Sequence, residues 1–246
     1  MIQMNSHPLA GKRGLVLGIA NEHSIAYGCA EAFRALGAEV AVTFLNDKPK
    51  PYVEPLAKTL AAPIFMPCDV SREGELEAVF ERIGSEWGQL DFALHSIAFA
   101  PRDDLHGRLV DCSRDGFLTA MDISCHSFIR MARLAEPLMT KGGALFTMSY
   151  IGAEKVIENY NLMGPVKAAL EGSVRYLAHE LGPRKIRVHA ISPGPLMTRA
   201  ASGIAKFDEL MDHTAKRMPM HDEVTISDAG MTTAYLATDY ARSMTC

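Results

Sequence analysis

Two tyrosines and a lysine are the residues of this chain whose types and spacing are best suited to chemistry. Tyr150, Tyr160 and Lys167 lie within residues 149–167, after an apolar run typical of a buried strand and before a stretch with helical periodicity. Tyr160 and Lys167 are seven residues apart, so we expect both on one helix face. A phenol donates a hydrogen bond to an oxygen that gains negative charge, and a nearby ammonium favours that charge. The spacing indicates oxyanion stabilisation, although such pairs also arise by chance on helix faces.

Length and composition limit the kinds of protein this can be. The 246 residues suffice for a full hydrophobic core, and no stretch resembles a linker, so we expect a single domain over residues 1–246. A net charge of −4 without a dense basic cluster argues against a nucleic-acid partner. The five scattered cysteines predict free thiols in a reducing cytoplasm and no metal site. We find no signal peptide and no apolar run long enough to span a membrane.

Six short apolar runs alternate with helical patterns along the chain. We expect strands at residues 12–19, 39–45, 64–66, 90–97, 145–149 and 186–191, and helices at 25–36, 51–60, 71–83, 113–139 and 160–181. This alternation predicts an α/β fold: a doubly wound Rossmann-type domain, with a parallel sheet and helices on both faces. Ligands of such sheets bind outside the carboxyl ends of the strands.

A glycine-containing turn follows the first expected strand and opens a helix. The series Gly18, Ser24, Ala26 and Gly28 stands where the usual three-glycine fingerprint would be. Backbone N–H groups and a helix N-terminus in this place can hold a pyrophosphate, with Gly28 permitting close packing. A simple strand-to-helix turn is the alternative interpretation.

Two further strand ends bear on the cofactor. No arginine that could bind a ribose 2′-phosphate follows the second strand, which favours NADH over NADPH. Asp69 and Val70 end the third strand and could hold an adenine edge, while Asp69 could equally cap a helix. Ser71 is the expected N-cap of the next helix.

Segments along nearly the whole chain resemble the short-chain dehydrogenase/reductase superfamily, and more closely its branch of enoyl-acyl-carrier-protein reductases from bacterial type II fatty-acid synthesis. Matching pieces include GIANEHSIAYG (18–28), DFALHSIAFAP (91–101), SYIGAE (149–154), NYNLMGPVKAALE (159–171) and IRVHAISPGPLMT (186–198). The distinctive feature is the spacing of Tyr150, Tyr160 and Lys167, because ordinary superfamily members place the lysine four residues after the tyrosine.

The resemblance implies reduction of a trans-2-enoyl thioester, carried on acyl carrier protein, by NADH. Tyr160 would donate a hydrogen bond to the thioester oxygen as it becomes an enolate, Lys167 would bind the nicotinamide ribose, and Tyr150 would line the acyl pocket. The implied cofactor positions are Gly18, Ser24, Ile25, Leu45, Asp69, Val70, Ser96, Ile97, Ala98, Lys167, Leu196 and Thr198. The implied substrate positions are Ala100, Tyr150, Tyr160, Met163, Ala200, Ile204 and Phe207, with a flap at residues 195–218. A cytoplasmic homotetramer is also implied.

Three features of the sequence depart from this family. Asp208 and Glu209 stand in the expected flap helix, where the family usually carries more basic residues that attract the acidic carrier protein. Pro165 predicts that the helix carrying Lys167 begins late or bends. The family continues into a seventh strand that the sequence does not include, so we expect the sixth strand at the sheet edge. A ketone or 3-oxoacyl reductase of the same superfamily is an alternative, disfavoured because Gly164 stands where those enzymes carry lysine. A noncatalytic dinucleotide-binding protein is the other alternative.

Overall fold

A six-stranded parallel sheet forms the centre of the computed structural model, which describes residues 6–198, 211, 218–220 and 222–246. The strand order is β3-β2-β1-β4-β5-β6, and every neighbouring pair is parallel. The strands are β1 (Arg13–Leu17), β2 (Glu39–Phe44), β3 (Phe65–Pro67), β4 (Phe92–His95), β5 (Gly143–Met148) and β6 (Ile186–Ile191). All six predicted strands are present, and the predicted α/β fold is confirmed. The order reverses between β1 and β4, the place where such sheets bind dinucleotides.

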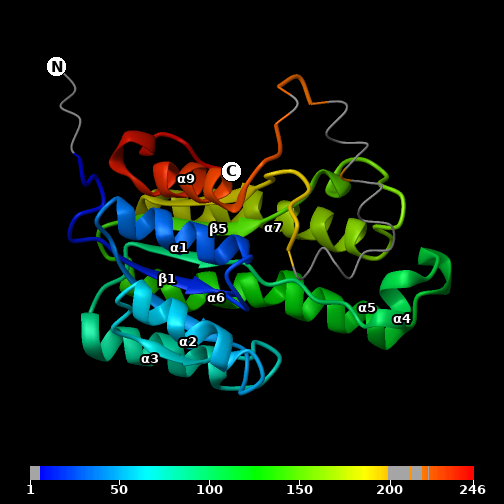
Figure 1. The fold of residues 1–246 in the computed structure, drawn as a ribbon, viewed down its shortest axis with the longest axis horizontal. Coiled ribbons are helices and arrows are strands. Elements are labelled where there is room, and N and C mark those ends of the chain that lie inside the picture. The colour runs from blue at the N-terminus through cyan, green and yellow to red at the C-terminus, as the bar shows by residue number, and fades with distance from the viewer. Residues whose placement is uncertain (1–5, 199–210, 212–217, 221) are drawn as a thin grey trace.

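Helices cover both faces of the sheet, each over its own buried apolar cluster. One face carries α1 (Ile25–Ala35), α2 (Lys50–Thr59) and α9 (Ile226–Ala237), and the other carries α3 (Glu75–Trp87), α6 (Ser127–Ala135) and α7 (Met163–Leu181). Helices α1 and α9 lie side by side (Figure 1). Gly28 makes this approach possible, because a Cβ there would lie 2.3 Å from the carbonyl oxygen of Ile226. The close packing expected at Gly28 is therefore packing against α9.

The long helical stretch predicted at residues 113–139 is built from several segments. A short helix α4 (Arg102–His106) precedes it, and it begins with α5 (Arg114–Met121), where the Ser113 side chain accepts a hydrogen bond from the Gly116 N–H. A π-helical turn (Asp122–His126) then separates α5 from α6. Ser124 in this turn accepts from the Phe99 N–H (2.9 Å) and donates to the Phe99 carbonyl (3.0 Å). The π turn therefore fixes the loop that leaves β4.

Helix α3 begins later than predicted, at Glu75. Gly74 precedes it in the left-handed region (φ 85°), and no side chain caps the helix. The prediction that Ser71 is the N-cap is wrong, since Ser71 instead donates to the Asp69 carboxylate at 2.6 Å. The Asp69 carboxylate closes this local turn, and Gly74 is the N-cap of the helix.

Helix α7 begins at Met163, after Tyr160, in agreement with the late start predicted from Pro165. Pro165 therefore lies in the first turn, where a backbone N–H has no intrahelical partner and a proline costs little. Tyr160 lies in the turn before the helix, so the prediction that it shares a helix face with Lys167 is wrong. Tyr160 is placed instead by its contact with the Tyr150 ring, and Lys167 by its hydrogen bond to the Met148 carbonyl.

Strand β6 is the last strand of the sheet, as expected. Its outer edge is met by the final residues of the chain: the Cys246 N–H donates to the Val188 carbonyl at 2.7 Å, and the Val188 N–H donates to Thr245 Oγ1 at 3.0 Å.

Candidate active site

The three predicted catalytic residues converge where β5 ends and α7 begins. The rings of Tyr150 and Tyr160 lie 4.9 Å apart, centroid to centroid, and are tilted by 60°. Gly152 makes room for them, because a Cβ there would come within 2.4 Å of the Tyr160 ring. The Lys167 ammonium donates a 2.6 Å hydrogen bond to the carbonyl of Met148, two residues before Tyr150. The lysine therefore links α7 to the end of β5, which is followed by Tyr150.

Lys167 is buried, with only 5% of its surface exposed. Burial lowers its pKa to about 8, and the nearby Cys125 and Glu171 oppose that shift. Glu171 lies one helical turn further along α7 and accepts a hydrogen bond from the Ser149 hydroxyl. Lys167 is thus a cation at neutral pH, and it sits close enough to its pKa to titrate under mildly alkaline conditions.

Both tyrosines are neutral donors at neutral pH. Burial raises the pKa of Tyr160, and the neighbouring Tyr150 adds to that shift. Burial also raises the pKa of Tyr150, which is half-buried. Because Tyr160 is almost fully buried and Tyr150 less so, Tyr160 is the better protected donor for a developing oxyanion.

An apolar cluster surrounds the Tyr160 ring. Its members from the predicted substrate set are Ala100, Tyr150, Tyr160 and Met163, which pack with Ala120, Leu162 and Val166. The structure therefore brings these four predicted residues to one place. The remaining three, Ala200, Ile204 and Phe207, lie outside the described residues.

The turn after β1 is shaped for close backbone approach. Gly18 has φ 106°, and a Cβ there would lie 2.1 Å from the Ser96 carbonyl oxygen at the end of β4. The Ser24 hydroxyl turns inward and accepts from the N–H groups of Ala20 (3.0 Å) and Asn21 (3.1 Å). The first N–H groups of α1, beginning with Ile25, have no partner within the helix and point outward from its N-terminus. This arrangement fits a pyrophosphate.

The loop after β3 is held from two sides. The Asp69 N–H donates to the Glu75 carboxylate at 2.7 Å, and Arg130 of α6 donates to the Val70 carbonyl at 2.9 Å. Arg130 also contacts both carboxylate oxygens of Glu77, at 2.9 and 3.1 Å. The loop predicted to meet the adenine is therefore rigidly placed.

The other predicted cofactor residues follow strand ends at this same edge of the sheet. Leu45 follows β2 and is exposed, Ile97 and Ala98 follow β4, and Leu196 and Thr198 follow β6, where the Thr198 N–H donates to the Leu196 carbonyl at 2.8 Å.

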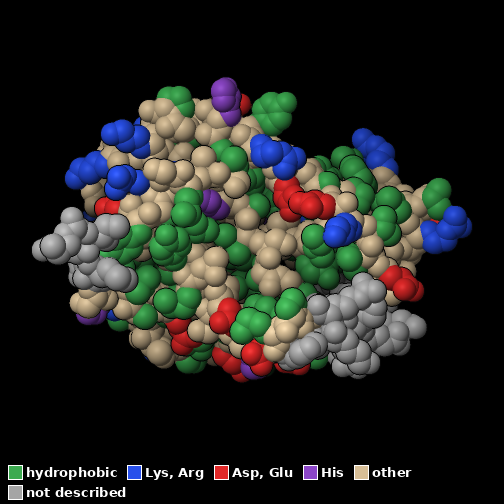
Figure 2. All heavy atoms as spheres, turned by 90° about the horizontal axis from the view of Figure 1, so that it is seen from above, with side chains coloured by type: hydrophobic (Ala, Val, Ile, Leu, Met, Phe, Trp, Pro, Cys, Tyr) green, Lys and Arg blue, Asp and Glu red, His purple; other side chains and the backbone are tan. Residues whose placement is uncertain are grey.

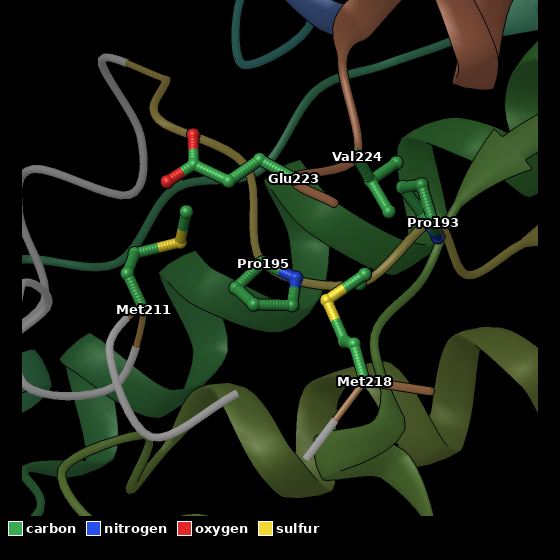
Figure 3. Close-up of a pocket in the computed structure, with 7 residues that line it drawn as sticks. Pro193, Pro195, Met211, Met218, Glu223 and Val224 are labelled. Carbon is green, nitrogen blue, oxygen red and sulfur yellow. The ribbon is translucent and has the colours of Figure 1, made fainter. Parts of the chain in front are cut away.

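A cavity of about 170 Å³ lies beside the loop after β6 (Figure 3). Pro193, Pro195, Met211, Met218 and Val224 line it, with the Glu223 carboxylate beside them. Its lining contains none of the three predicted catalytic residues. Three of its lining residues belong to the predicted flap at residues 195–218, so the cavity adjoins that segment and is not lined by the predicted catalytic residues.

On the face that carries α9, several basic side chains gather at the upper left, and the other basic side chains in view lie apart among acidic and apolar ones (Figure 2). None of the helices in the described part of the chain is both long and apolar enough to cross a membrane.

Several residues of the site were not predicted from the sequence. Each makes a hydrogen bond to a residue distant in the sequence. The Asn161 amide donates to the Leu105 carbonyl at 3.0 Å. The other pairs are Ser124 with Phe99, Arg130 with Val70, and Glu171 with Ser149. No spacing in the sequence relates these partners, which lie 22 to 60 residues apart. The two asparagines beside Tyr160, a residue type frequent in left-handed turns, were the one local signal.

A parallel sheet in this order, with a glycine turn after β1 and a tyrosine–lysine pair after β5, defines a dinucleotide-binding oxidoreductase. The family model described as enoyl-(acyl carrier protein) reductase matches residues 18–246. The chain belongs to this family.

Curated relatives and solved structures agree with this assignment. The chain is 47% identical to the enoyl-acyl-carrier-protein reductase (NADH) of Salmonella typhimurium over 94% of this chain and 88% of the relative. It is 46% identical to enoyl-acyl-carrier-protein reductase (NADH) 1 of Rhizobium meliloti, over 96% of this chain and 86% of the relative. The reductase structure from Anaplasma phagocytophilum, in complex with NAD, superimposes with a TM-score of 0.93 at 46% identity, covering 98% of this chain and 92% of that one. The predicted enzyme class and cofactor are confirmed.

Proposed function

We propose that this chain reduces trans-2-enoyl thioesters presented by acyl carrier protein, with NADH as the reductant and Tyr160 as the donor to the thioester oxygen. Bound NADH supplies a hydride to the β-carbon of the substrate, and the electron pair of the double bond moves onto the carbonyl oxygen. The Tyr160 phenol donates a hydrogen bond to that oxygen as it becomes an enolate. The α-carbon then takes a proton to complete the saturated product.

Lys167 and Tyr150 support this step. The Lys167 ammonium keeps the potential positive beside the oxyanion and binds the nicotinamide ribose hydroxyls. Tyr150 lines the acyl pocket next to the carbonyl. Gly18, the N-terminus of α1 and the Asp69–Val70 loop hold the dinucleotide. The proposal is supported by two observations: the Tyr150 and Tyr160 rings pack together with centroids 4.9 Å apart, and Lys167 is anchored at 2.6 Å to the Met148 carbonyl, two residues before Tyr150.

Gly164 supports this reading over a 3-oxoacyl reductase. It stands where such a reductase carries lysine, and a Cβ there would lie 3.2 Å from the Gly152 carbonyl oxygen, which is tighter than ordinary contact. A lysine at this position would crowd the glycine that accommodates the tyrosine rings.

The quaternary and domain arrangement belongs to the same proposal. We infer a cytoplasmic homotetramer, because the resemblance carries that assembly, and a single domain with a substrate flap at residues 195–218. Light scattering with size-exclusion chromatography measures the assembly, and a monomer at micromolar concentration would contradict it.

The reaction is tested by mixing the protein with NADH and crotonyl-CoA or a crotonyl carrier protein, and following the loss of reduced nicotinamide absorbance. Tyr160→Phe should lower kcat/KM by about 10²–10³-fold, the usual effect of removing one oxyanion donor. Tyr176→Phe is the matched control, since Tyr176 lies on helix α7, which follows Tyr160, and is 74% exposed. Full activity of Tyr160→Phe would overturn the role given to that phenol.

A further inference from the structure

We propose that Asn161 is a positioning residue that holds Tyr160 in its working orientation, through a left-handed backbone and an amide hydrogen bond. The inference rests on the role proposed above for Tyr160 and extends it to a residue that touches neither the reacting atoms nor the cofactor turn.

The backbone on both sides of Tyr160 is unusual. Asn159 has φ 64° and Asn161 has φ 42°, so the phenol is bracketed by two left-handed residues. L-residues rarely adopt this region, and asparagine does so more readily than most. A change at either position lets the loop relax, and Tyr160 is the side chain whose direction depends on both.

Backbone hydrogen bonds form turns along the loop that carries Tyr160. It is closed by single backbone turns: the Tyr160 N–H donates to the Ile157 carbonyl, the Met163 N–H to Tyr160, and the Gly164 N–H to Asn161, each at 3.1 Å. Such turns persist only while their residues keep their backbone angles. The Tyr160 direction is therefore set by local conformation and by side-chain contacts.

The Asn161 side chain supplies the long-range contact. Its Nδ2 donates to the Leu105 carbonyl in α4 at 3.0 Å, across 56 residues of sequence. Leu105 packs against the same apolar cluster as Tyr160. The amide thus ties the loop carrying the phenol to the opposite wall of that cluster.

A purely structural role predicts something different. Helix α7 begins at Met163, beyond this bracket, and its core residues are buried independently of Asn161. A structural role would change unfolding temperature without a specific loss of turnover. A positioning role lowers kcat while leaving NADH binding intact, because the glycine turn and the Asp69 loop are not touched.

The experiment compares Asn161→Ala with Asn161→Gly in the full chain, using NADH and crotonyl-CoA. Alanine removes the amide and disfavours φ 42°, so the competent loop becomes a minor conformer and kcat should fall about ten-fold. Glycine removes the same amide but adopts a positive φ without strain. The kcat of Asn161→Gly should therefore be about three-fold higher than that of Asn161→Ala. KM for NADH and NADH binding by fluorescence should stay within about two-fold of the unmodified protein in both variants.

Two results would overturn the inference: Asn161→Ala with unchanged kcat, or Asn161→Gly no more active than Asn161→Ala. If alanine prevents folding, the glycine variant still decides, since a kcat equal to that of the unmodified protein would contradict the amide contribution. Tyr160→Phe is measured beside them. If it is fully active, the proposed function fails first; if it is inactive while the Asn161 variants are normal, only this inference fails.

Discussion

Lys167 carries a positive charge in a place where charge is costly. It is buried on α7, and one backbone carbonyl is its hydrogen-bond acceptor among the described residues. The groups that face it are His95 on β4, Cys125 in the π turn and Glu171 on its own helix. Desolvation is the largest influence and lowers its pKa to about 8, whereas the Tyr160 pKa moves upward. The lysine therefore titrates first as pH rises.

Activity and stability should respond to this titration in opposite directions. Above pH 8 the folded protein loses the Lys167 proton, so kcat/KM should fall. An unfolded lysine keeps its proton to about pH 10.5, so the unfolded state binds more protons between pH 8 and 10.5 and the free energy of unfolding rises with pH there. The checks are a kcat/KM profile from pH 6.5 to 9.5 and urea unfolding of the cofactor-free protein over the same range.

Lys167→Met provides the control for both halves of this prediction. It should abolish most activity and remove the lysine's contribution to the slope of unfolding free energy against pH. An unchanged slope in Lys167→Met would mean that another group causes the alkaline rise.

At the scale of helices and strands, hydrophobic periodicity predicts whether a segment is a helix or a strand, and packing decides at which residue it begins. The six strands follow from apolar runs that must be buried on both faces of a parallel sheet. The start of α3 was misplaced because the Ser71 hydroxyl hydrogen-bonds the Asp69 carboxylate and does not cap the helix. Tyr160 was wrongly placed on a helix, because it lies in the turn before α7 with its ring against Tyr150. Helix α9 was missed altogether, although Thr225 and Asp228 form a capping box at its start.

The candidate site divides in the same way. Tyr150, Lys167 and Gly18 could be placed from the sequence because each follows a strand end or a helix start. Ser124, Arg130 and Asn161 could not, because each acts on a partner that only the folded chain brings near. The substrate residues predicted in the flap, Ala200, Ile204 and Phe207, lie outside the described part of the chain and stay predictions.

The α1–α9 contact gives a prediction about stability. Gly28→Ala places a Cβ 2.3 Å from the Ile226 carbonyl oxygen, so the helices must separate. Overpacking of this kind costs about 1–3 kcal/mol. Gly84→Ala on α3 is the matched control, because its Cβ meets only Leu138 at an ordinary 3.6 Å. That change should stabilise by about 0.5–1 kcal/mol through helix propensity.

Urea unfolding followed by circular dichroism would measure both glycine variants. Equal effects of Gly28→Ala and Gly84→Ala would show that the helix crossing tolerates a methyl group. In that event the close approach of α1 and α9 would not be a determinant of stability.

At the scale of the whole molecule, the centre of the sheet contains a titratable group that the chemistry does not use. His95 on β4 is fully buried, and its Nε2 lies 2.6 Å from Ser127 Oγ. That hydroxyl donates to the Ile123 carbonyl at 2.6 Å, so Nε2–H is the donor to the serine and the ring is neutral. Burial, with the charge of Lys167 adding to it, lowers the pKa of His95 to about 3.

This histidine should make the protein sensitive to acid well above the pH at which carboxylates titrate. Between pH 6.5 and 3, His95 is protonated in the unfolded state and neutral in the folded state. The free energy of unfolding therefore falls as pH falls. His189, whose pKa burial lowers to about 4, acts in the same direction. The combined loss should reach roughly a few kcal/mol by pH 4. His95→Gln should make the slope of unfolding free energy against pH shallower, whatever the variant does to stability at pH 7.5. His179→Gln is the control, because His179 is exposed on α7, and it should leave the slope unchanged. Identical slopes in the two variants would mean that acid unfolding begins elsewhere than in the core of the sheet.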